Sequence, residues 1–163
     1  MNKIVKAMIA MSLVGAMTQA NAGTTEIHEH KSLDIGSMPV PKIQLSVFRD
    51  AIDGVNVNVK VQNYLLNAPD TVEADSEVLQ GHAHVFVNGI KKQRLYGDNI
   101  HIPNEWLKKG VNQIAISLNS HQHENWVKDN SNIVGSVFIN LQSKGLVLHN
   151  YTSQPLENHH AHH

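Results

Sequence analysis

Histidine is the residue type in this chain whose number and spacing could do chemistry. The 163 residues include 12 histidines and no cysteine. A neutral imidazole offers a nitrogen lone pair near physiological pH and is the commonest protein ligand for transition metals. Most of the histidines come in groups: His28 and His30, His82 and His84, His121 and His123, and His159, His160, His162 and His163, with His101 and His149 alone. This pattern predicts a metal-binding protein.

The absence of cysteine narrows the metal chemistry. It excludes blue-copper, iron–sulfur and cysteine-ligated zinc sites, all of which require thiolates. Only Met38 remains among the methionines once the N-terminal apolar segment is set aside, so a thioether-rich copper(I) carrier is not expected. The sequence also lacks the Gly-x-Ser-x-Gly, P-loop and Rossmann motifs. Imidazole, with carboxylates in support, is the chemistry that remains.

The N-terminal segment has the pattern of a secretory signal peptide. Lys3 and Lys6 precede an apolar run over Ala7–Met17, and Ala20-Asn21-Ala22 forms a small-x-small cleavage site. The apolar run is shorter than the roughly 20 residues that span a bilayer. We therefore expect a periplasmic or secreted protein, cleaved after Ala22, with no membrane association of the mature chain.

The charge balance argues against polyanionic partners. The whole chain has a formal net charge of −1, and removal of Lys3 and Lys6 makes the mature chain more acidic. Neither nucleic acid nor an anionic membrane surface is expected to bind such a chain. The partners that the sequence predicts are a metal ion and a protein that donates or accepts it.

Alternating aliphatic and polar residues predict β-strands through most of the mature chain. In the segment 55–61 every second residue is valine, which is the period of a half-buried strand. Asp53-Gly54 and Asn88-Gly89 are hairpin turn signals, and no segment has sustained helical periodicity. We predict an all-β fold: a single antiparallel β-sandwich of about seven to eight strands, immunoglobulin-like or cupredoxin-like, with an eight-stranded closed barrel as the alternative.

These patterns divide the chain into a signal peptide 1–22, a flexible arm 23–40, a β-sandwich domain 41–150 and a disordered histidine-rich tail 151–163. The arm histidines His28 and His30 are expected to be solvated, and the tail histidines to bind metals loosely, unless the tail is an expression tag. With Gly23-Thr24-Thr25 at the mature N-terminus, no histidine stands where the terminal amine could share a metal with it.

The segment Gly81–Val87 carries the strongest metal motif. Side chains two apart on a strand point to the same face, so His82, His84 and Phe86 share one face and the three aliphatic residues between and after them share the other. The aliphatic face should face the core, which leaves the two imidazoles pointing outward or into a cleft. They form either a pre-positioned pair of metal ligands or ordinary exposed polar residues.

Three further histidines lie beside predicted strands. His101 is flanked by isoleucines, and His121 and His123 follow a strand that ends near Leu118. These groups could meet the His82/His84 pair at one end of the sandwich, giving three or four imidazoles, a ligand set that suits Cu(II) or Zn(II). Glu124 and Asp98 are near enough in sequence to orient the rings as hydrogen-bond acceptors.

Several of these motifs occur in a familiar order: Gly81-His82-Ala83-His84 with Val87-Asn88-Gly89, Arg94-Leu95-Tyr96-Gly97, Ile100-His101-Ile102-Pro103, and Leu118-Asn119-Ser120-His121-Gln122-His123. Over about Gln80 to Leu141 the chain resembles a group of small secreted bacterial β-sandwich proteins of mostly unknown function. In that group the last histidine usually stands alone. The resemblance implies that His82, His84, His101 and one loop histidine belong together; we assign His123 to this role, with His121 as the alternate.

The sequence therefore predicts an exported protein that buffers or delivers a metal ion, with copper favoured over zinc, through a surface site of histidines. Binding should weaken as the pH falls through about 6.5, where free imidazole protonates. One alternative is an enzyme with an open metal position, for which Glu124 or Asp98 would be the general base. Another is a metal-free adhesion or assembly domain. The residues favour a binding protein over an enzyme.

Overall fold

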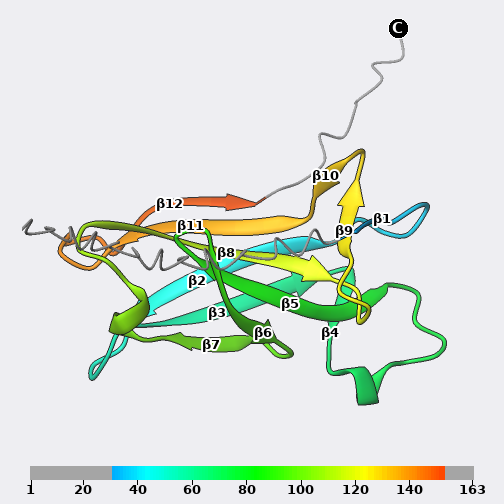
Figure 1. Cartoon of the computed structure of the whole chain (residues 1–163), viewed down its shortest axis with the longest axis horizontal. Coiled ribbons are helices and arrows are strands. Elements are labelled where there is room, and N and C mark those ends of the chain that lie inside the picture. The colour runs from blue at the N-terminus through cyan, green and yellow to red at the C-terminus, as the bar shows by residue number, and fades with distance from the viewer. Residues whose placement is uncertain (1–30, 153–163) are drawn as a thin grey trace, which may run out of the picture.

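Alternating aliphatic and polar residues build two β-sheets in residues 31–152, the part of the chain that the computed structural model describes (Figure 1). The smaller sheet is antiparallel, with the order β2-β3-β7. Its strands are β2 (Lys42–Arg49), β3 (Val55–Gln62) and β7 (Asn99–Ile102).

The larger sheet has nine strands and is mixed. They are β1 (Ser32–Asp34), β4 (Tyr64–Leu66), β5 (Leu79–Val87), β6 (Ile90–Leu95), β8 (Val111–Asn119), β9 (Asn125–Lys128), β10 (Ser131–Asn132), β11 (Val134–Asn140) and β12 (Val147–Thr152). Two 3-10 turns, η1 (Pro69–Thr71) and η2 (Asn104–Trp106), complete the described elements. Within residues 31–152 there is no α-helix, and no helix long and apolar enough to cross a membrane.

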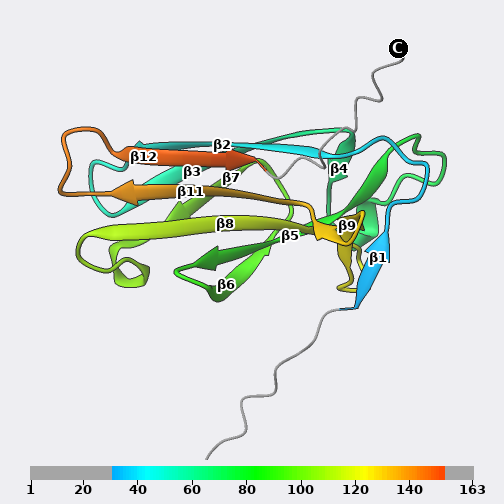
Figure 2. The ribbon, with the colours of Figure 1, turned by 90° about the horizontal axis from the view of Figure 1, so that it is seen from above.

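The core lies between the two sheets. Each long strand contributes one aliphatic face: Val55, Val57 and Val59 of β3 are at most 1% exposed, and Ile114 and Ile116 of β8 are fully buried. Burying one such side chain stabilises the fold by about 1.5–3 kcal/mol. Figure 2 shows the two layers in projection, with β2 on one side of the molecule and β8, β5 and β6 on the other.

The hairpin between β5 and β6 fixes which residues stand opposite the histidine strand. Asn88 and Gly89 have φ angles of 53° and 79°, the left-handed conformation of a two-residue hairpin turn. The register pairs Phe86 with Lys91, and a bulge between Val85 and Phe86 then places Arg94 opposite His84. This bulge brings two basic residues to the histidine-bearing face of β5.

The predicted all-β fold with two packed sheets is confirmed, and the closed barrel is excluded because the sheets are separate and open. The prediction of a purely antiparallel sandwich of seven to eight strands is wrong. Residues 31–152 form twelve strands, and β1–β9 and β4–β5 are parallel pairs. The extra strands are short segments without alternation. One of them, β1, lies in the segment expected to be a flexible arm, where the neighbouring Ile35 is only 3% exposed.

Gly81 provides a test of how tightly the strand ends pack. A Cβ atom at this position would overlap the backbone oxygen of Asn119 and lie 2.6 Å from Tyr64 Oη. We expect Gly81→Ala to lower the free energy of unfolding by about 2 kcal/mol or more, because overpacking forces backbone shifts. Gly97→Ala is the matched control, since nothing lies within 4 Å of a Cβ there. Equal urea unfolding midpoints for the two variants would contradict this packing.

Candidate metal centre

β5 is an inner strand, hydrogen-bonded to β6 on one edge and to β8 on the other. Ala83 and Val85 belong to the core between the sheets, so His82 and His84 lie on the opposite face, as predicted. The prediction of a surface site is wrong for these two rings, which are buried. His82 is 1% exposed and His84 is fully buried. The two imidazole rings therefore lie inside the protein, so other parts of the chain must cover this face of the sheet.

The loop between β8 and β9 provides part of this cover. It forms a tight turn in which His123 N–H donates to the Ser120 carbonyl (3.0 Å) and Ser120 N–H donates to the Glu124 carbonyl (2.9 Å). The Ser120 hydroxyl also donates to Glu124 Oε2 at 3.0 Å. The carboxylate that we expected to orient a histidine ring thus closes the loop instead.

His123 occupies a strained position in that turn. Its φ angle is +68°, in the left-handed region that residues with a Cβ rarely adopt. Such a conformation costs of order 1–3 kcal/mol and persists only where surrounding contacts enforce it. The turn thereby directs the His123 ring toward the buried pair.

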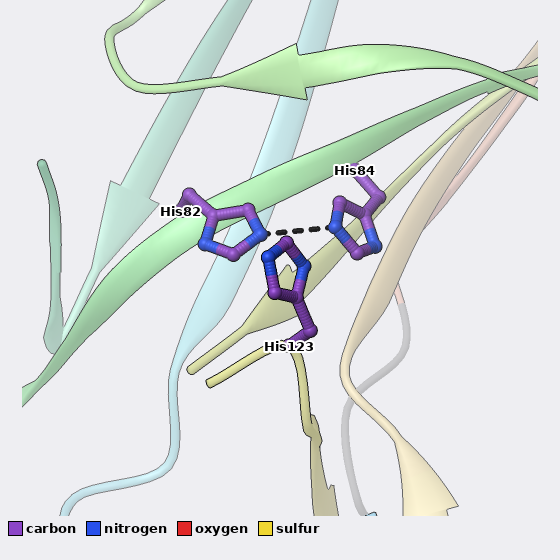
Figure 3. Close-up of side chains that lie close together, drawn as sticks. All are labelled: His82, His84 and His123. Carbon is purple, nitrogen blue, oxygen red and sulfur yellow. Dashed lines mark hydrogen bonds between the residues drawn. The ribbon is translucent and has the colours of Figure 1, made fainter. Parts of the chain in front are cut away.

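Three imidazoles meet on this face of the sheet (Figure 3). Each of His82, His84 and His123 offers one ring nitrogen, and these three atoms all lie within 4.8 Å of one another. The Nε2 atoms of His82 and His84 are 2.9 Å apart, and the His123 ring centroid is 4.9 Å from that of His82. Nitrogens bound to one tetrahedral ion at 2.0–2.1 Å are about 3.3 Å apart. Small ring rotations would therefore convert this cluster into a ligand set.

His121 lies beside the cluster and outside the group of three. Its ring stacks on His82 with centroids 6.0 Å apart, and its Nε2 is 3.1 Å from Asn67 Oδ1. The structure thus brings His123 into the cluster and holds the alternate, His121, against the loop that follows β4.

The structure does not bring His101 to the cluster, contrary to the prediction. His101 lies on β7, which pairs with β3 in the smaller sheet. Its Nδ1 is 3.1 Å from Asn56 Oδ1, its Nε2 is 3.7 Å from Asp53 Oδ2, and its side chain is 44% exposed. Asp98 belongs to the same region, since its carbonyl accepts from Val59 N–H. The alternation around His101 predicted correctly that its side chain points away from the core. It carried no information on which sheet the strand joins. The arm histidines and the tail histidines lie outside the described residues.

Two cations border the cluster: Lys91, which no sequence pattern singled out, and Arg94, which belongs to a quoted motif but had no predicted role. Lys91 Nζ is 3.1 Å from His84 Nε2, and Arg94 stands opposite His84 across the β5–β6 ladder. Burial lowers the pKa of Lys91, and the Arg94 charge lowers it further.

His82 is neutral over an unusually wide pH range. Burial lowers its pKa to about 4, and charge on His123, Arg94, His121 and Lys91 acts in the same direction. Protons therefore compete with a metal for His82 only at a pH well below about 6.5, the pKa of free imidazole. Its lone pair is available for a metal throughout the neutral and mildly acidic range.

Tyr64 positions the strand and the loop relative to each other. Its hydroxyl contacts the Asn119 carbonyl at 2.9 Å and the His82 carbonyl at 3.3 Å. Burial raises the pKa of the phenol well above its usual value, so Tyr64 remains a neutral donor. No sequence pattern pointed to this residue, because its partners are distant in the chain.

No protein-family profile, curated protein or solved structure matches the chain. The likeness to small secreted bacterial β-sandwich proteins therefore stays a prediction, and the geometry of the cluster is the basis for functional inference.

The lowered pKa of His82 predicts a pH-dependent stability of the metal-free protein. The unfolded chain takes up a proton near pH 6.5, whereas folded His82 resists protonation down to about pH 4. Stability should therefore be complete above pH 6.5 and fall as the pH is lowered toward 4. The loss attributable to His82 is about 1–3 kcal/mol, smaller where solvent screens the ring.

Urea unfolding at pH 7 and pH 4 measures this loss, with His82→Gln as the variant that cannot titrate. The variant should lose less stability than the wild type over this range. His149→Gln, at an exposed position on β12, is the matched control and should behave as the wild type. Parallel pH profiles for the wild type and His82→Gln would contradict the assignment.

Proposed function

We propose that the protein binds a transition-metal ion through His82, His84 and His123. The observation that carries this proposal is the convergence of three ring nitrogens within 4.8 Å on a buried face of the sheet. Two of the ligands come from one inner strand, which limits their motion, and the third comes from a hydrogen-bonded turn. Three protein ligands leave a fourth coordination position for an exogenous group.

Copper is the favoured ion and zinc the second candidate. Imidazole ligands suit both metals, and a given nitrogen site binds Cu(II) more tightly than Zn(II). The cluster offers neither a thiolate nor a carboxylate, so harder ions such as magnesium or calcium would find no suitable ligands there.

Buffering or delivery of the ion accounts for the cluster better than catalysis. A metal-dependent hydrolase needs a general base beside the open position. The Glu124 carboxylate accepts from Ser120 within its own turn, and no carboxylate belongs to the cluster of described residues. Partly exposed His123 gives the ion a route to and from the interior, so a partner protein could supply or remove it.

Export to the periplasm is part of the same proposal. It is supported by the basic, apolar and small-residue pattern of the first 22 residues. An immunoglobulin-like or cupredoxin-like assignment for the sandwich, and kinship with small secreted bacterial β-sandwich proteins, are proposals at the same level.

Metal titration of the purified protein tests the site. The tail histidines, which would bind metal independently, are first replaced by glutamine in the full chain. We expect one Cu(II) or Zn(II) per chain, and His82→Ala, His84→Ala and His123→Ala should each weaken binding by at least about tenfold, because a ligand is lost. Isothermal calorimetry or competition with a chromophoric chelator measures the change.

His101→Ala and His149→Ala are the matched controls, since both residues are described histidines outside the cluster. They should bind metal as tightly as the parent protein. Absence of any metal binding by the folded parent protein would overturn the proposal and favour a metal-free adhesion or assembly domain. If the two control substitutions weakened binding as much as the three substitutions in the cluster, the assignment of the site would be overturned.

Export makes a separate prediction. Protein recovered from the periplasm of an expressing bacterium should begin at Gly23, because the signal peptide is removed after Ala22. N-terminal sequencing or intact mass gives the result, and Ala20→Arg, which disrupts the small-x-small site, should block processing. An unprocessed chain that remains in the cytoplasm would contradict it.

A further inference from the structure

The cluster has two cations at its edge. Lys91 Nζ lies 3.1 Å from His84 Nε2. Arg94 is the cross-strand neighbour of His84, and its Nη1 is 3.4 Å from the Tyr96 hydroxyl. The Tyr96 ring in turn lies 5.8 Å from the His82 ring. Lys91, Arg94 and Tyr96 therefore border the same histidines that would hold a metal.

The contact from Lys91 assigns the protonation of His84. An ammonium group only donates hydrogen bonds, so His84 Nε2 is the acceptor and carries a lone pair. His82 Nε2, 2.9 Å away, then donates to the same nitrogen. A metal ion that binds His84 through Nε2 would take this lone pair and leave the Lys91 ammonium in need of another acceptor.

Among the described residues, no anionic acceptor lies near Lys91. Within residues 31–152 no carboxylate lies at ion-pair distance from Lys91 or Arg94. The cluster itself consists of imidazoles, which are neutral when they bind metal. A metal cation would thus bind among buried imidazoles beside two exposed positive charges and no negative one, so charge near the metal is unbalanced within the described residues.

We propose that the metal binds together with a small oxyanion of the carboxylate or bicarbonate class. One oxygen takes the open coordination position on the metal, and another accepts a hydrogen bond from Lys91. This inference rests on the proposed function. A halide would satisfy the charge but not the geometry, because it has a single atom, whereas an oxyanion offers two acceptors and pairs well with lysine or arginine.

Zn(II) affinity measured in acetate and in perchlorate, at equal ionic strength and pH, tests the proposal on the full chain with its tail histidines replaced by glutamine. We expect acetate to tighten Zn(II) binding by about tenfold, because charge-assisted hydrogen bonds are the strong ones. Lys91→Met should abolish this tightening and Lys91→Arg should retain it. Lys92→Met is the matched control: Lys92 is the next residue on β6, but its Nζ lies 5.6 Å over the Trp106 ring, and the acetate effect should be unchanged.

The outcomes separate this inference from the function on which it rests. Equal Zn(II) affinity in acetate and perchlorate would overturn the oxyanion and leave the metal site standing. An acetate effect that survives in Lys91→Met would overturn the role of Lys91. Failure of the folded protein to bind any metal in either salt would overturn the proposed function itself. Loss of the acetate effect in Lys91→Met, with retention in Lys91→Arg and Lys92→Met, would support the proposal.

Discussion

Two imidazole rings buried on an inner strand impose the constraint on which this end of the molecule depends. A buried polar ring needs hydrogen-bond partners, because desolvation without them costs several kcal/mol. His82 and His84 form a hydrogen bond between their Nε2 atoms. Lys91 also donates to the Nε2 atom of His84. The loop that carries His121 and His123 then stacks rings against them. The loop histidines thus shield the buried pair from solvent, and one of them, His123, also belongs to the candidate metal site.

The segment around Asn119 transmits this constraint to the rest of the sheet. Its side-chain oxygen accepts from the Ser117 hydroxyl at 2.9 Å, and its side-chain nitrogen donates to Asn125 Oδ1 at 2.6 Å. Its carbonyl accepts from Tyr64. The two ends of the loop, Asn119 and Asn125, are also paired as neighbours in β8 and β9. His123 is therefore held on a loop that is anchored at both ends, which reduces the entropy lost when a ligand orders it.

Local sequence patterns predicted the strands and turns, which depend on residues close together in the chain. They did not predict features that depend on residues far apart in the chain. Valine alternation predicted β3, the Asn88-Gly89 turn predicted the β5–β6 hairpin, and two-residue spacing placed His82 and His84 on one face. Their burial was missed because the covering loop begins at Ser120, more than thirty-five residues further along the chain. His101 was misassigned because alternation gives the face of a strand, not the sheet that it joins. Arg94 reaches His84 only through a bulge, which no sequence signal marked.

The same cations act in opposite directions on protons and on metals. Lys91 and Arg94 help to keep His82 unprotonated, and so keep its lone pair free. They also repel any other cation in proportion to its charge, and solvent screens this repulsion because both side chains are exposed. A divalent ion therefore meets twice the repulsion of a proton at equal distance, and coordination bonds must exceed it. A monovalent copper ion meets half the repulsion of a divalent one, and a bound oxyanion offsets it for either ion. The surrounding charge thus disfavours a bare divalent cation relative to one that arrives with an anion.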